Sequence, residues 1–145
     1  MLSQDFREFV ELLNKHKVEY LIVGGYAVGI HGYPRFTGDL DVWINPDELT
    51  AQLMVRVIKE FGFGRFGLSE ADFTTKDNII QLGYPPFRID VLTNIDGVSF
   101  KECYPNRLVL EDEGVPVNFI SLTDLRKNKE SSGRRRDLDD LENLK

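Results

Sequence analysis

The chain has 145 residues, of which 41% are hydrophobic and 29% charged, and its formal net charge is −6. This length and composition predict one soluble globular domain over 1–145 and argue against a disordered or membrane-spanning chain. The acidic balance argues against non-specific DNA binding, because such binding depends on many cationic contacts. With one cysteine, Cys103, and a charged start that lacks the apolar core of a signal peptide, we expect a cytoplasmic protein without membrane association.

Apolar residues recur with helical or strand spacing, and glycine, proline and capping residues separate the segments. Ser3 and Ser121 are candidate N-caps, and 45–48 has the pattern of a helix start with Asn45 as its cap and Pro46 in the first helical position. In chain order the predicted elements are a helix over 4–15, a strand over 20–23, a short helix over 25–32, a strand over 39–44, a helix to about residue 60, strands over 78–82 and 87–92, a hairpin of 107–110 and 115–120, and C-terminal helices from residue 121 and over 134–144.

This order of elements predicts a mixed α/β (α+β) fold in which helices flank a small sheet. The sheet should contain both parallel and antiparallel neighbours, since short hairpin connections alternate with helical crossovers. The helix that ends near residue 60 should turn its apolar side chains inward, namely Leu49, Leu53, Val57 and Ile58.

Two aspartates one residue apart, Asp39 and Asp41, lie in the apolar strand predicted over 39–44. Successive side chains on a strand point to opposite faces, so the two carboxylates share one face. Two like charges about 5 Å apart repel by roughly 3 kcal/mol at an effective dielectric near 20. A divalent cation is the simplest group that would offset this repulsion; the alternative is a solvated strand face that carries two surface acids.

The glycine pair Gly24-Gly25 follows one predicted strand and opens a predicted helix. Such a turn lets the backbone approach a phosphate closely, although it can also be a plain strand-to-helix connection. The spacing Gly24-x4-Gly29 imitates the start of a Walker A loop. Ile30-His31 stands where that loop needs Lys-Ser/Thr, which excludes a P-loop.

Asp90 is a lone acid flanked by aliphatic residues in the strand predicted over 87–92. If that strand lies beside the strand over 39–44, Asp90 meets Asp39 and Asp41 on one face. Three converging carboxylates favour a site for Mg²⁺, which binds through oxygen ligands.

Six basic residues stand between positions 126 and 136 against one acid, Glu130. In an otherwise acidic protein, this cationic patch suits local binding of a metal-complexed polyanion; the alternative is a solvated helix end. The basic residues are Arg126, Lys127, Lys129, Arg134, Arg135 and Arg136.

Four segments together resemble the nucleotidyltransferase superfamily that includes polymerase beta. They read LIVGGYAV over 21–28, RFTGDLDV over 35–42, IDV over 89–91 and KESSGRRRDLDDL over 129–141. The closest likeness is to small bacterial members related to abortive-infection (AbiEii-type) nucleotidyltransferase toxins. The resemblance covers about 20–142 and implies the nucleotidyltransferase fold.

The resemblance also implies a site and a reaction. Two Mg²⁺ ions, or Mn²⁺, would assist transfer of a nucleoside monophosphate from an NTP such as ATP to a hydroxyl acceptor, with release of pyrophosphate. The acceptor could be a small molecule, a tRNA end or a protein side chain, and an antitoxin partner is a further expectation. The implied residues are Asp39, Asp41 and Asp90 for metal and catalysis, and Gly24, Gly25, Arg35, Thr37, Lys129 and Arg134 for the nucleotide.

Two alternatives stay open at this point. One is a non-catalytic member that binds a nucleotide or a partner protein, as half of a toxin–antitoxin-like pair. The other is a metal-dependent phosphohydrolase that uses the same carboxylates on water.

Overall fold

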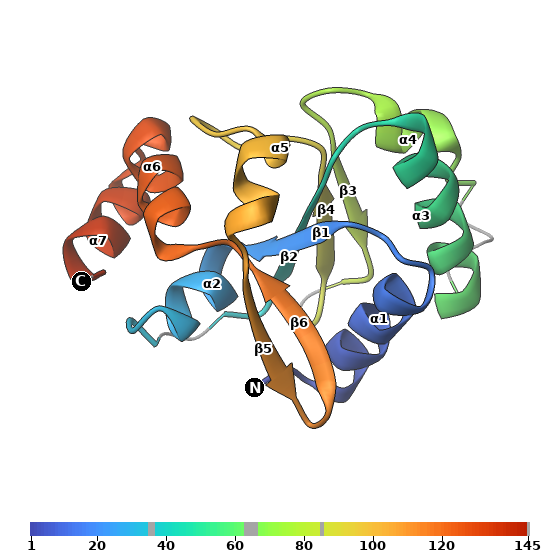
Figure 1. Cartoon of the computed structure of the whole chain (residues 1–145), viewed down its shortest axis with the longest axis horizontal. Helices are drawn as coiled ribbons and strands as arrows, with labels where there is room; N and C mark the ends of the chain where they lie inside the picture. Colours follow the sequence, from blue (N-terminus) through green and yellow to red (C-terminus); the bar gives the residue numbers. More distant parts are fainter. Residues whose placement is uncertain (35–36, 63–66, 85, 145) are drawn as a thin grey trace.

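The structure is a computed structural model that describes residues 1–34, 37–62, 67–84 and 86–144. Strands in these ranges form one mixed sheet in the order β3-β4-β2-β1-β6-β5 (Figure 1). The strands are β1 (Tyr20–Val23), β2 (Leu40–Ile44), β3 (Ile79–Leu82), β4 (Ile89–Leu92), β5 (Leu108–Asp112) and β6 (Val115–Phe119). The helices are α1 (Gln4–Lys15), α2 (Gly24–Ile30), α3 (Glu48–Phe61), α4 (Glu70–Thr74), α5 (Phe100–Cys103), the 3₁₀ turn η2 (Tyr104–Asn106), α6 (Leu122–Ser132) and α7 (Arg135–Asn143).

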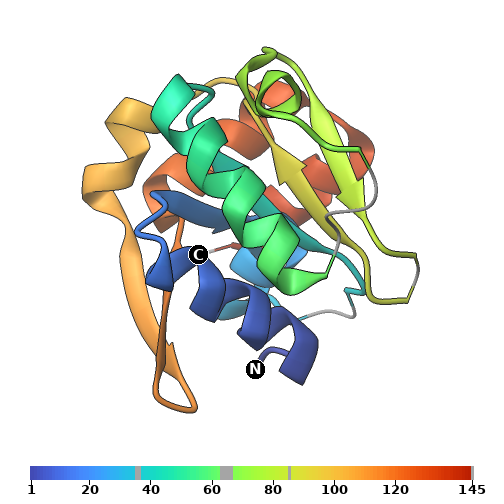
Figure 2. The same cartoon turned by 90° about the vertical axis from the view of Figure 1, so that its right-hand side faces the viewer.

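The sheet mixes both pairing modes, as the sequence predicts. Strand β2 runs antiparallel to β1 and parallel to β4, while β6 runs parallel to β1. Each outer strand, β3 or β5, closes an antiparallel pair with its neighbour. Helices α1, α3 and α4 lie to one side of the central strands, and α2, α6 and α7 lie to the other (Figures 1 and 2). The predicted fold class is therefore confirmed.

The N-terminal elements follow their sequence signals closely. Helix α1 spans Gln4–Lys15, and the hydroxyl of Ser3 accepts a hydrogen bond from the amide of Phe6, so the predicted cap is confirmed. The helix buries Phe6, Phe9, Val10 and Leu13, and every residue of β1 is buried. Full burial of each such aliphatic or phenyl side chain contributes about 1.5–3 kcal/mol.

The start of α3 differs from the prediction. Its N-cap is Asp47, whose Oδ1 accepts from the amide of Thr50 at 2.7 Å, and the predicted cap Asn45 instead donates to the Asp47 carboxylate at 2.9 Å. The inward face also differs from the prediction: Leu49 is 65% exposed and Met54 is buried. The prediction that Leu49 faces inward was wrong; Leu53 is partly buried, and Val57 and Ile58 are buried.

Helices α4 and α5 and the turn η2 were not predicted, because they are too short for an apolar period to stand out. A capping box formed by Ser69 and Asp72 opens α4 and was a readable signal. Helix α5 places Phe100 edge-on against Trp43 of β2, with ring centroids 5.2 Å apart. These short elements complete the apolar core beside the central strands.

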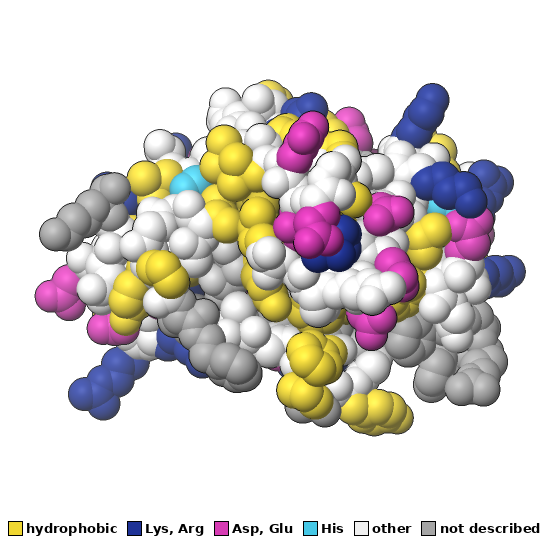
Figure 3. Space-filling model, turned by 90° about the horizontal axis from the view of Figure 1, so that it is seen from below, with side chains coloured by type: hydrophobic (Ala, Val, Ile, Leu, Met, Phe, Trp, Pro, Cys, Tyr) yellow, Lys and Arg dark blue, Asp and Glu magenta, His cyan; other side chains and the backbone are white. Residues whose placement is uncertain are grey.

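Within the ranges that the structure describes, no helix has the length and apolar character needed to cross a membrane. The face seen from below carries acidic, basic and apolar side chains interspersed with one another (Figure 3).

Candidate functional site

Three aspartates meet at one end of the neighbouring strands β2 and β4; we call Asp39, Asp41 and Asp90 the aspartate triad. Asp41 of β2 stands directly opposite Asp90 of β4 in the parallel register. Asp39 immediately precedes β2 and lies two residues from Asp41, so it belongs to the same face. Asp90 is only 8% exposed. The predicted adjacency of the two strands is thus confirmed.

The glycine pair packs directly against this face. Gly24 has φ +68°, and a Cβ built on it would stand 2.0 Å from the Asp41 carboxylate; on Gly25 it would stand 2.6 Å from the hydroxyl of Thr37. A side chain at either position would have to displace Asp41 or Thr37, and at Gly24 it would also need the left-handed backbone that favours glycine. Both glycines nevertheless line the smaller of the two cavities described below. Arg35, which was predicted together with Thr37 for the nucleotide site, lies outside the described residues.

The aspartate triad carries surplus negative charge. Burial raises the pKa of Asp41 to about 7, and repulsion from Asp90 and Asp39 adds to the rise, while Lys129 and Arg88 act in the opposite direction. A carboxylate in this state binds a proton or a cation readily, because either one relieves the repulsion.

Arg88 is the partner of the aspartate triad that the sequence reasoning missed. Its Nη2 donates to Asp39 at 2.9 Å and to Asp90 at 3.0 Å, and its Nε donates to Asp90 at 2.7 Å. The side chain is 24% exposed at the cavity wall. The spacing Arg88-x-Asp90 on one strand was the available signal, since it places both side chains on one face.

Lys129 is held in a second charged group, which we call the lysine cluster: Lys129, Ser132, Arg134, Asp137 and Asp140. Lys129 is 5% exposed, and its ammonium bonds to Asp137 at 3.0 Å and Asp140 at 3.1 Å. Arg134 donates from Nε to Asp137 at 2.7 Å, and the Ser132 hydroxyl donates to the same carboxylate. Burial pushes the pKa of Asp137 upward, but these three donors outweigh it and lower the pKa to about 2.

The lysine cluster therefore joins α6 to α7. The two basic residues predicted to bind the nucleotide, Lys129 and Arg134, differ in their exposure at the cavity. Lys129 lines the cavity with its charge bonded to two carboxylates, whereas the Arg134 side chain is 76% exposed. Arg136, which the sequence analysis did not select, lines the same space.

Two adjacent cavities open beside the aspartate triad, with volumes of about 270 and 570 Å³. The smaller one lies over the glycine turn, and the larger one extends past Asp90 toward Asn78 and Ile79 at β3. Both share the residues Gly24, Asp39, Asp41, Lys129, Arg134 and Arg136. The aspartate triad thus faces a space that can hold a ligand on either side of Asp41.

The donor chemistry of the aspartate triad fits a hard divalent cation: three carboxylates, one of them desolvated and repelled by the other two. In the side-chain positions found over 1–34, 37–62, 67–84 and 86–144, no three acidic, histidine or cysteine groups are close enough to hold a metal ion. Two of the three carboxylates are bonded instead to the Arg88 guanidinium.

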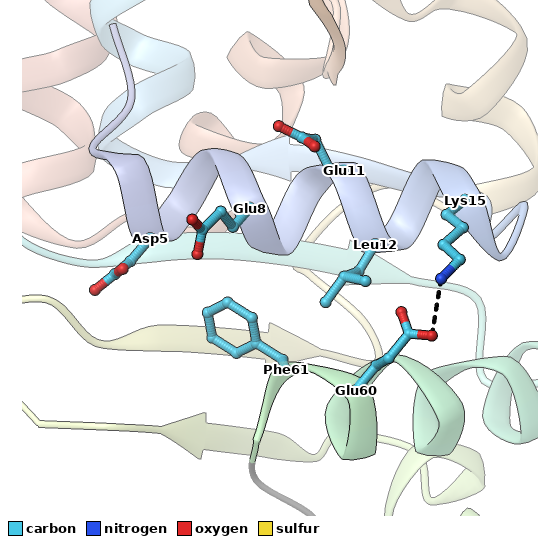
Figure 4. Close-up of a pocket in the computed structure, with 7 residues that line it drawn as sticks. All are labelled: Asp5, Glu8, Glu11, Leu12, Lys15, Glu60 and Phe61. Carbon is cyan, nitrogen blue, oxygen red and sulfur yellow. Dashed lines mark hydrogen bonds and ion pairs between the residues drawn. The ribbon is translucent and has the colours of Figure 1, made fainter.

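A hollow of about 630 Å³ between α1 and α3 lies apart from these groups (Figure 4). Lys15 of α1 bonds to Glu60 of α3 at 2.9 Å across it, and Leu12 and Phe61 lie between the two helices. Its other acids, Asp5, Glu8 and Glu11, all come from α1. We interpret this hollow as the seam between two packed helices.

Solved structures similar to this chain support the same fold. The crystal structure of TM1012, a nucleotidyltransferase candidate from Thermotoga maritima, superposes with a TM-score of 0.63 at 16% identity, covering 94% of this chain and 88% of that one. An antigenic nucleotidyltransferase-like protein from Paracoccidioides brasiliensis gives a TM-score of 0.56 at 20% identity, covering 99% and 77% of the two chains. None of the curated proteins matches the sequence. Over residues 2–145 the sequence matches the family described as "Nucleotidyltransferase of unknown function (DUF6036)", and the chain belongs to that family.

Proposed function

We propose that the protein is a Mg²⁺-dependent nucleotidyltransferase that transfers a nucleoside monophosphate from an NTP to a hydroxyl acceptor. The observation that carries this proposal is the meeting of the aspartate triad with the Gly24-Gly25 turn, beside cavities on both sides of Asp41. Two bound Mg²⁺ ions, or Mn²⁺, would stabilise negative charge on the entering and leaving oxygens.

The side of the site toward β1 suits the triphosphate. There Gly24 and Gly25 line the smaller cavity, with Asp41 and Thr37 packed against them, and the exposed Arg134 and Arg136 bring positive charge to the cavity rim. Thr37 lies over Gly25 and would shape the entry. Lys129 would act from the wall, as a buried charge that lowers the pKa of Asp41.

The side of the site toward β3 suits the acceptor. Asp90 stands between Asp41 of β2 and Gln81 of β3, so it faces the half of the larger cavity that extends to Ile79. The acceptor oxygen would attack the α-phosphorus as the bond to the β-phosphate oxygen breaks and pyrophosphate leaves. Asp90 would take the hydroxyl proton. The acceptor is a small molecule, a tRNA end or a protein side chain.

The test is a screen of the four α-³²P-labelled NTPs, with Mg²⁺ or Mn²⁺, against pools of cellular RNA, protein and small molecules. Wild type should form a labelled adduct and release pyrophosphate, and Asp39→Ala should do neither while keeping its circular dichroism spectrum. Asp47→Asn is the matched control, because Asn also caps a helix and position 47 lies outside the site.

Each other outcome identifies a different class. Adduct formation by Asp39→Ala contradicts the metal role of the aspartate triad. If the protein binds NTP but releases no pyrophosphate with any acceptor pool, it is a non-catalytic member that binds a nucleotide. An antitoxin-like partner, and a relation to abortive-infection toxins, would then be tested next. Hydrolysis of the NTP to labelled NDP or NMP, without an adduct, indicates a phosphohydrolase.

A further inference from the structure

Arg88 holds two carboxylates of the aspartate triad in one fork. Its Nε and Nη2 both bond to Asp90, and Nη2 also bonds to Asp39. Arg88 and Asp90 are separated by one residue of β4, whereas Asp39 comes from the segment that leads into β2. The guanidinium therefore ties β2 and β4 together at the point where their carboxylates repel one another.

The guanidinium of Arg88 makes contacts like those of a bound cation. A guanidinium bonded to two carboxylates supplies positive charge and directional donors, and a divalent cation would supply more charge to the same oxygens. Arg88 occupies lone pairs of the same Asp39 and Asp90 carboxylates, and its positive charge repels a cation bound beside it, so the two compete. Asp41 lies outside this fork, and its pKa stays raised although Arg88 acts to lower it.

We propose that Arg88 is a positioning residue that holds Asp39 and Asp90 in the metal-free protein and is displaced from them when a divalent cation binds. The inference rests on the proposed function, since it takes the aspartate triad to be the metal site. The larger cavity borders Arg88, so the side chain has space into which it can move. Arg88 thus weakens metal binding by the free protein while keeping the carboxylates aligned.

The first test measures Mn²⁺ binding in the absence of nucleotide, by the loss of the free Mn²⁺ signal in electron paramagnetic resonance. Arg88→Gln should bind Mn²⁺ about tenfold or more tightly than wild type, because a competing charge-assisted contact has been removed. Arg88→Lys keeps the positive charge but loses the two-pronged hydrogen bonding, so its Mn²⁺ affinity should lie between those of wild type and Arg88→Gln. This variant also provides the test if Arg88→Gln does not fold. Arg56→Gln, an exposed arginine on α3, is the matched control and should leave the affinity unchanged.

The second test follows Arg88 directly. In the metal-free protein its Nε–H should give a protected ¹⁵N–¹H signal, identified by its loss in Arg88→Lys. Mg²⁺ should abolish or shift that signal in wild type and leave it unchanged in Asp41→Asn. A purely structural arginine would keep the signal when Mg²⁺ binds.

The outcomes separate this inference from the proposed function. Equal or weaker Mn²⁺ affinity in Arg88→Gln, with clear binding by wild type, overturns the role of Arg88 and leaves the metal site standing. No Mn²⁺ binding by wild type or either Arg88 variant overturns both the competition and the metal dependence.

Discussion

The lysine cluster and the aspartate triad stand at the same cavity but differ in how their charges are matched. In the lysine cluster, one buried ammonium meets two buried carboxylates, and further donors complete the hydrogen bonds of Asp137. In the aspartate triad, one guanidinium bonds to two of the three carboxylates, and the third, Asp41, keeps a strongly raised pKa. A buried group whose charges are matched holds structure together, whereas a group left with surplus charge calls for a ligand.

The largest expected effect tests the matched side of this comparison. Lys129→Met removes the ammonium and leaves Asp137 and Asp140 buried, so the free energy of unfolding should fall by about 3–5 kcal/mol. Lys127→Met, at an exposed position of the same helix, should change it by less than about 0.5 kcal/mol. Urea denaturation of both variants at pH 7 measures the difference. Equal stability of the two would show that the lysine cluster does not join α6 to α7.

The next effect concerns the side with surplus charge. Asp41→Asn removes a proposed metal ligand, and since even an outer-shell partner of a metal is worth about 10–100-fold, transfer should fall by about 100-fold or more. The free energy of unfolding in EDTA should stay the same or rise, because the substitution relieves the repulsion that raises the pKa of Asp41. A variant that loses both activity and stability would instead assign Asp41 to the structure.

Acid should weaken the lysine cluster in a defined range of pH. Because the pKa of Asp137 is about 2 in the folded protein and near 4 when unfolded, this carboxylate contributes about 2 kcal/mol above pH 4, which is lost as pH falls toward 2. Stability of wild type and Asp137→Asn is compared between pH 5 and pH 2.5. The variant should show the smaller decrease, and parallel curves would refute this assignment.

The smallest expected effect is a difference in stability between alanine substitutions at two glycines of α2. Gly24→Ala forces a side chain into the left-handed region and against Asp41, so it should cost about 1–2 kcal/mol. The added methyl group of Gly29→Ala meets no atom within 4 Å in the last turn of α2, so this change should stabilise by up to about 0.5–1 kcal/mol. Thermal unfolding of the two variants should therefore shift in opposite directions. A shift in the same direction would mean that the turn can move away from the aspartate triad.

Sequence patterns predicted those parts of the site that depend on local geometry. Alternation along a strand placed Asp39 and Asp41 on one face, and the lone acid at position 90 pointed to a neighbouring strand. The register that sets Asp41 opposite Asp90 is a long-range property that one sequence does not encode visibly. Arg88 was missed because its Asp39 partner lies 49 residues away along the chain.

The lysine cluster was seen in part for a similar reason. The basic run was visible, but the turn at Gly133, which has φ +64° and lets α7 fold back against α6, decides which carboxylates Lys129 meets. In α3, two cap candidates two residues apart competed, and the Asp47 carboxylate bonded to the Thr50 amide determined the outcome. Leu49 was placed on the wrong face for a different reason: its apolar character predicted burial, but the buried face of α3 includes the polar Thr50 and the small Ala51.

The parallel pairing of β2 with β4 also has a consequence for how the protein folds. These strands are separated by almost fifty residues, so their contact forms only after a long loop has closed, which is characteristic of late and slow steps. A one-residue slip in their alignment would turn Asp90 to the opposite side. In a refolding experiment, the appearance of Mn²⁺ affinity should accordingly trail the recovery of helical signal and report the moment at which the correct alignment is reached.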